Sequence, residues 1–126
     1  MITRKIHATR TRYIEMNIEV YHLDWDKIDR RTDTGWHLTF RPTAEAVAEA
    51  WKAGLYKKVV DVPMDKPFKR GLGLLDQAFE ATNTINEPWF AKFPGTPPTR
   101  STSVGDIIVM HGVKYFVDLI GFTSFA

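Results

Sequence analysis

Cysteine is absent from the 126 residues of the sequence, which excludes disulfides, zinc–thiolate sites and cysteine nucleophiles. Long hydrophobic runs are absent too, since no apolar stretch approaches the roughly 20 residues that a membrane helix needs. The first residues carry charge without a following apolar block, so we do not expect a secretory signal. These absences favour a protein of the reducing cytoplasm with no membrane partner.

The sequence also lacks a strong excess of charge of one sign. Lys and Arg total 17 against 15 Asp and Glu, a net charge of +2 that is too mild to imply nucleic-acid binding by itself. Basic residues gather in 1–12 and 41–70, acidic residues in 13–40, and residues 71–126 are nearly neutral. The length predicts one domain over 1–126, with residues 1–12 forming either a basic arm or an edge strand.

The hydrophobic pattern predicts an α+β fold. Strict alternation over 13–22 indicates a strand with one wet face, and Thr43 and Gly54 suit the two ends of a helix. In chain order we expect strands at 13–22 and 36–40, a helix at 44–53, a strand at 55–62, a helix at 72–82, and strands at 106–110 and 113–119, with 120–125 closing the chain. This order predicts a mainly antiparallel sheet with a C-terminal β-hairpin and two helices packed on one face.

The stretch 84–103 is predicted as a loop that is long for so small a domain. It holds several aromatic residues with basic neighbours. If exposed, they would form a binding surface for a partner, and if buried, they would anchor the loop to the body. A basic turn at 69–70 precedes the second predicted helix but lacks the spacing of a nucleotide motif. The candidate partner-binding residues are therefore Trp89, Phe90, Lys92, Phe93, Arg100, Lys69 and Arg70.

Catalytic and metal-binding motifs are not found. The four histidines do not stand at metal-ligand spacing. Asp24 and Asp26 suggest calcium, but Ile28 and Asp29 stand where an EF-hand needs an oxygen ligand and a glycine. No glycine-flanked nucleophile occurs near Ser101. We expect no metal, no cofactor, no small-molecule ligand and no enzymatic activity.

The C-terminal segment carries a family resemblance. Ser103-Val-Gly-Asp106, Tyr115-Phe-Val-Asp118 and Gly121-Phe122 stand where the YodL-like domain family has a serine-rich turn, a hairpin and a closing Gly-Phe. The chain resembles that family over roughly 18–125, with Asp76 and Trp89-Phe90 as departures from its pattern. Side chains that bond to the backbone and glycines that accept positive φ build tight turns, so four residues are interpreted as structural: Ser103, Gly105, Asp106 and Gly121.

The resemblance implies a context for function. YodL-like domains occur in bacterial, phage and conjugative-element proteins, sometimes joined to antirestriction or other counter-defence modules. It therefore implies a small phage or mobile-element accessory protein that binds and inhibits or modulates a host protein, as anti-CRISPR or antirestriction proteins do. The alternative is a nucleic-acid-binding module that uses the basic residues of 1–12 and 52–70.

Overall fold

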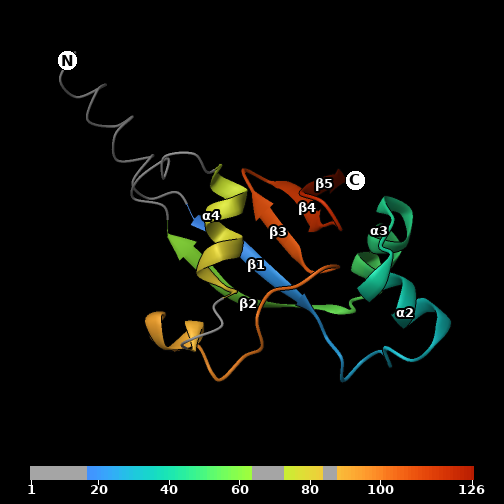
Figure 1. Ribbon diagram of the computed structural model, residues 1–126, viewed down its shortest axis with the longest axis horizontal. Coiled ribbons are helices and arrows are strands. Elements are labelled where there is room, and N and C mark those ends of the chain that lie inside the picture. Colours follow the sequence, from blue (N-terminus) through green and yellow to red (C-terminus); the bar gives the residue numbers. More distant parts are fainter. Residues whose placement is uncertain (1–16, 64–72, 84–87) are drawn as a thin grey trace, which may run out of the picture.

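The fold is an α+β arrangement around one antiparallel sheet, as expected (Figure 1). The computed structural model describes residues 17–63, 73–83 and 88–126. Within them, five strands form the sheet in the order β2-β1-β3-β4-β5. Their bounds are β1 (Asn17–Leu23), β2 (Tyr56–Pro63), β3 (Ile107–Met110), β4 (Val113–Val117) and β5 (Phe122–Phe125). The expectations for residues 1–12, Lys69 and Arg70 lie outside the described residues.

The predicted C-terminal hairpin is confirmed. β3 and β4 pair from Ile107 with Phe116 to Met110 with Val113. His111 and Gly112 form the turn with φ angles of 53° and 76°, the left-handed conformation that matches the twist of two-residue hairpins. Residues 122–125 extend the sheet beyond the predicted hairpin, as a further strand beside β4.

The described residues form three α-helices and a short 3-10 helix around the sheet: α2 (Asp33–Phe40), α3 (Ala44–Lys52), α4 (Leu74–Ala81) and η1 (Trp89–Lys92). α3 begins where predicted, because the side chain of Thr43 accepts a hydrogen bond from the N–H of Ala46. No helix among the described residues is long and apolar enough to span a membrane.

The prediction of a strand at 36–40 is wrong, since these residues belong to α2. The alternation of Trp36, Leu38 and Phe40 is typical of a strand, but only Leu38 of the three is buried. Thr32 caps the helix by accepting a hydrogen bond from the N–H of Gly35. Gly35 then packs against the backbone of Asp29 so closely that a Cβ atom would lie 2.0 Å from the Asp29 carbonyl oxygen.

The helices cover both faces of the sheet instead of one. Successive residues of a strand point to opposite faces, and β1 and β3 bury residues on each. Val20 and Ile108 face a core that includes Ala78 of α4, while Leu23 and Ile107 face a core built with α2 and α3. In Figure 1, α4 lies across β1 and β3, and α2 and α3 lie together away from it. On β1 the expected alternation is confirmed over 17–22, because Ile18, Val20 and His22 are buried while Asn17 is exposed and Glu19 and Tyr21 are partly exposed. Leu23, the last residue of the strand, is buried in the second core.

Candidate functional site

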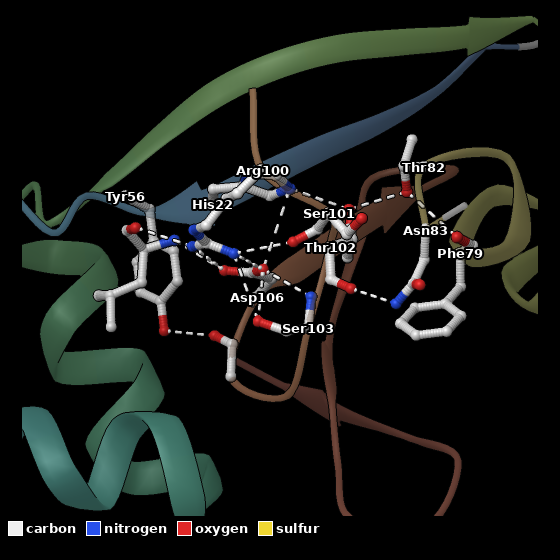
Figure 2. Close-up of polar contacts among 12 residues, drawn as sticks. His22, Tyr56, Phe79, Thr82, Asn83, Arg100, Ser101, Thr102, Ser103 and Asp106 are labelled. Atoms are coloured by element: carbon white, nitrogen blue, oxygen red, sulfur yellow. Dashed lines mark hydrogen bonds and ion pairs between the residues drawn. The ribbon is translucent and has the colours of Figure 1, made fainter. Parts of the chain in front are cut away.

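The Ser-Val-Gly-Asp segment builds a buried polar cluster at the end of β1 (Figure 2). The Asp106 carboxylate is 1% exposed and accepts hydrogen bonds from the backbone N–H groups of Leu23 at 2.9 Å and Ser103 at 2.8 Å. Arg100 completes it through a two-point ion pair, with Nη1 2.6 Å from Oδ2 and Nη2 2.9 Å from Oδ1. Asp106 therefore joins β1 to the 100–106 loop.

Gly105 occupies the tightest point of this cluster. Its φ of +91° is the left-handed conformation that glycine accepts most readily, as the turn interpretation requires. A Cβ atom there would lie 1.9 Å from the carbonyl oxygen of Leu38, so α2 rests directly on the turn. The hydroxyl of Tyr56 donates to the Gly105 carbonyl at 2.8 Å, and burial raises the pKa of this hydroxyl well above its ordinary value. The second predicted turn glycine, Gly121, also has positive φ, at +71°, but an open surrounding.

A series of hydrogen bonds between side chains connects β1 to α4. Nε2 of His22 lies 2.8 Å from the Thr102 hydroxyl, which donates to the Thr82 hydroxyl at 2.8 Å. Thr82 in turn donates to the carbonyl oxygen of Ala78. Because each hydroxyl has one proton and both are used, Nε2 must be the donor to Thr102. Burial lowers the pKa of His22 to about 4, so the ring is neutral near pH 7 and its Nδ1 is an acceptor.

The aromatic residues of the predicted 84–103 loop pack against the body of the protein. Trp89 is 1% exposed, and its Nε1 donates to the carbonyl oxygen of Arg100 at 3.0 Å. Phe90 and Phe93 are partly buried and pack edge-on against the indole. Lys92 is exposed nearby. The structure thus brings Trp89, Phe90 and Phe93 together under the loop, and not on an exposed surface.

A pocket of about 410 Å³ lies beside this cluster. His22, Asp24, Lys57 and Arg100 are among its lining residues. The ring of Trp25 also borders it, with the guanidinium carbon of Arg100 4.0 Å from the ring centroid. The sequence pattern does not reveal this pocket, because its walls come from β1, β2 and the segment 97–100, which are distant in the chain.

An exposed aromatic pair lies on α2. Trp36 is 42% exposed and Phe40 is 51% exposed, and their ring centroids are 5.8 Å apart. They stand four residues apart, which places them on one face of the helix. The pair is not among the residues predicted from the sequence, because the alternation over 36–40 is typical of a strand. The helix-capping position of Thr32 was the signal that could have revealed it.

Comparison of the sequence with protein-family models finds no match, and searches of curated proteins and of solved structures find none either.

Proposed function

We propose that this protein acts by binding a partner protein through the outer face of α2. In the setting that the resemblance to YodL-like domains implies, it is a phage or mobile-element accessory protein that modulates a host protein in the bacterial cytoplasm. The observation that carries the proposal is the exposed pair Trp36 and Phe40. Large aromatic side chains contribute most of the binding energy at many protein interfaces.

The helix that carries this pair is held firmly against the body. Gly35 packs on the backbone of Asp29, and the Leu38 carbonyl packs on Gly105. A rigid helix presents its side chains without a large loss of conformational entropy on binding. This rigidity supports α2 as a preformed surface that inserts two rings into an apolar pocket of the partner.

The nucleic-acid alternative draws less support from the described residues. Nζ of Lys58 lies 2.8 Å from a carboxylate oxygen of Asp61 and 3.4 Å from one of Glu19. Nζ of Lys57 lies 3.9 Å from Asp24. These neighbouring carboxylates compensate the charge that would attract phosphate. We therefore treat nucleic-acid binding as an outcome that the test must distinguish.

The prediction that the protein is not an enzyme also stays part of this proposal. The Asp106 carboxylate is engaged with its neighbouring side chains and with the backbone. Arg100, Ser103 and the N–H of Leu23 all bond to the same carboxylate. Groups held in this way support the fold and leave the function to surface binding.

The test is capture of a host protein by three purified, tagged forms of the chain. Wild type is compared with a Trp36→Ala/Phe40→Ala double variant and with a Leu119→Ala/Ile120→Ala control. Leu119 and Ile120 are 63% and 92% exposed, so the control removes apolar surface elsewhere without touching the core. We expect wild type and control to retain the same host protein, and the α2 variant to bind it at least about tenfold more weakly.

The outcome that contradicts the proposal is equal retention by the α2 variant while it stays folded by circular dichroism. Titration with heparin and duplex DNA at two salt concentrations forms the second arm. Tight DNA binding that weakens steeply with salt would instead favour the nucleic-acid alternative.

A further inference from the structure

The strand β5 lies at one end of the sheet, and β4 is its one strand neighbour among the described residues (Figure 1). Helices contact it on both faces. The ring of Phe122 packs edge-on against Phe79 of α4, with 6.3 Å between the centroids, and the ring of Phe125 packs against Trp51 of α3 at 6.4 Å. The strand is therefore held in place by its side chains, and its outer backbone edge is the part that a further strand could join.

The pairing with β4 determines which backbone groups of β5 point outward. The N–H of Asp118 donates to the Gly121 carbonyl oxygen at 2.9 Å, so these two residues form a hydrogen-bonded pair. Hydrogen-bonded and non-hydrogen-bonded pairs alternate along an antiparallel ladder, so Thr123 also bonds inward to β4. Phe122 and Ser124 therefore direct their N–H and C=O groups outward. Within the described part of the chain, these outward groups bond to no other backbone segment.

The two edges of the sheet differ in the features that prevent strand addition. The outer strand β2 carries Lys57, Lys58 and Asp61 and ends at Pro63. Charged side chains and proline are the means by which edge strands resist pairing with another chain. The strand β5 has the sequence Phe-Thr-Ser-Phe, which contains neither a charged residue nor a proline. The β5 edge is therefore the one suited to accept a further strand.

A second copy of β5 matches this edge by symmetry. When two β5 strands run antiparallel about a two-fold axis at Thr123, Phe122 of each copy stands opposite Ser124 of the other. The outward N–H and C=O groups then form two hydrogen bonds in each of these two residue pairs. Because β5 is uncharged, the pairing places no like charges opposite each other.

We propose that the protein forms a two-fold symmetric homodimer in which β5 pairs antiparallel with β5 of a second copy, centred on Thr123, so that the two sheets become continuous. The dimer goes beyond partner binding through α2, because the paired residues do not include Trp36 or Phe40. Failure of one proposal therefore leaves the other standing.

The first experiment tests the register of the pair with engineered disulfides. The chain has no cysteine, so each variant carries a single thiol. Thr123→Cys places that thiol opposite its own copy in a non-hydrogen-bonded pair, where the α-carbons are about 4.5 Å apart, within disulfide range. Ser124→Cys is the matched control on the same strand. Its two copies are offset by two residues, about 7 Å along the strand, which is beyond disulfide reach.

In a glutathione redox buffer we expect Thr123→Cys to yield at least about tenfold more covalent dimer than Ser124→Cys. Random collision predicts the opposite order, because Ser124 is exposed and Thr123 is only partly exposed. Equal yields, or a larger yield from Ser124→Cys, would overturn the proposal.

The second experiment removes one outward donor from each copy. Ser124→Pro deletes an N–H that makes no bond to β4, and proline is tolerated on the outer side of an edge strand. Ser124→Ala keeps this N–H and is the matched control. Sedimentation equilibrium from about 10 µM to 1 mM measures the association. A few backbone hydrogen bonds predict a weak dimer, with a dissociation constant of roughly 1 mM or lower for wild type and Ser124→Ala.

We expect Ser124→Pro to associate at least about tenfold more weakly than Ser124→Ala. Wild type that is monomeric at the highest concentration would overturn the proposal, as would a folded Ser124→Pro variant that dimerises as wild type does. If Ser124→Pro does not fold, the comparison of the two cysteine variants decides the result.

Discussion

The α-carbon of Gly105 faces the carbonyl oxygen of Leu38 so closely that a Cβ atom would lie 1.9 Å from it. This contact joins the turn before β3 to the middle of α2. Because no side chain fits at this contact, α2, which carries the proposed binding surface, can pack on the turn only if residue 105 is glycine.

We expect Gly105→Ala to lower the free energy of unfolding by roughly 3 kcal/mol, because it adds overpacking to the penalty of positive φ. The φ angle of Gly105 alone predicts that Gly105→Val lowers stability more than Gly105→Ala. The contact with the Leu38 carbonyl oxygen makes the loss of stability large for both variants. Gly121→Ala is the control, since its φ is +71° but no atom lies within 4 Å of the added Cβ. Urea unfolding of the two alanine variants measures the difference, and equal midpoints would contradict the Leu38 contact.

The second prediction concerns pH. Burial lowers the pKa of His22 to about 4, against an ordinary value near 6.5 in the unfolded chain. Between these values the unfolded state binds more protons, so stability rises with pH in this window and is lost as the pH falls from 6.5 toward 4. The expected contribution is about 3 kcal/mol.

His22→Gln isolates this effect, because its amide N–H can still donate to Thr102 but does not titrate. Unfolding free energies at pH 7 and pH 4 should differ more for wild type than for His22→Gln. Parallel pH curves for the two proteins would show that His22 is not buried in its neutral form.

The third prediction concerns Arg100. Arg100→Met leaves the Asp106 carboxylate, which is 1% exposed, without its cation, and removal of one partner of a buried pair is strongly destabilising. We expect a loss of about 3 kcal/mol, since the Arg100 side chain itself is 23% exposed. Arg31→Met, which breaks the exposed pair with Asp29, should leave the thermal unfolding midpoint unchanged. Similar midpoints for both variants would contradict the structural role of the Arg100–Asp106 pair.

The fourth prediction separates anchoring from recognition in the 88–100 segment. Trp89→Ala should lower stability by about 3–5 kcal/mol, as expected for a buried aromatic side chain. Trp89→Phe keeps most of the packing and loses the hydrogen bond to the Arg100 carbonyl oxygen. It should therefore lower the free energy of unfolding by only about 1 kcal/mol relative to wild type. Thermal denaturation measures both. A stable Trp89→Ala variant that loses the partner would show that this segment is an interface after all.

Patterns within short stretches of sequence predicted one helix and the C-terminal hairpin correctly. The helix at 44–53 depends on Thr43 and on apolar residues at helical spacing, and the C-terminal hairpin depends on two β-rich runs around His111-Gly112. Both are confirmed. The segment 36–40 was mispredicted because Trp36, Leu38 and Phe40 alternate, although the packing of Gly35 and the Thr32 cap make it helical.

The site could be predicted only in part, because its partners meet through the tertiary fold. The turn roles of Gly105 and Asp106 follow from the residue types. That Asp106 would bond to Leu23, or that His22 would meet Thr102, does not follow, since 83 and 80 residues separate these pairs. The two faces of the sheet are likewise distinguishable only once β1 is known to lie between β2 and β3.

The position of β1 has a consequence for how the chain matures on the ribosome. Its neighbour β3 follows it by more than 80 residues in the sequence. The N–H of Leu23 can therefore bond to the carboxylate of Asp106 only after that segment has been synthesised. Pairing over such separations is slow, and exposed strand edges favour aggregation. The nascent N-terminal half therefore emerges with one edge of β1 unpaired, and coexpression with a chaperone should raise the yield of native protein.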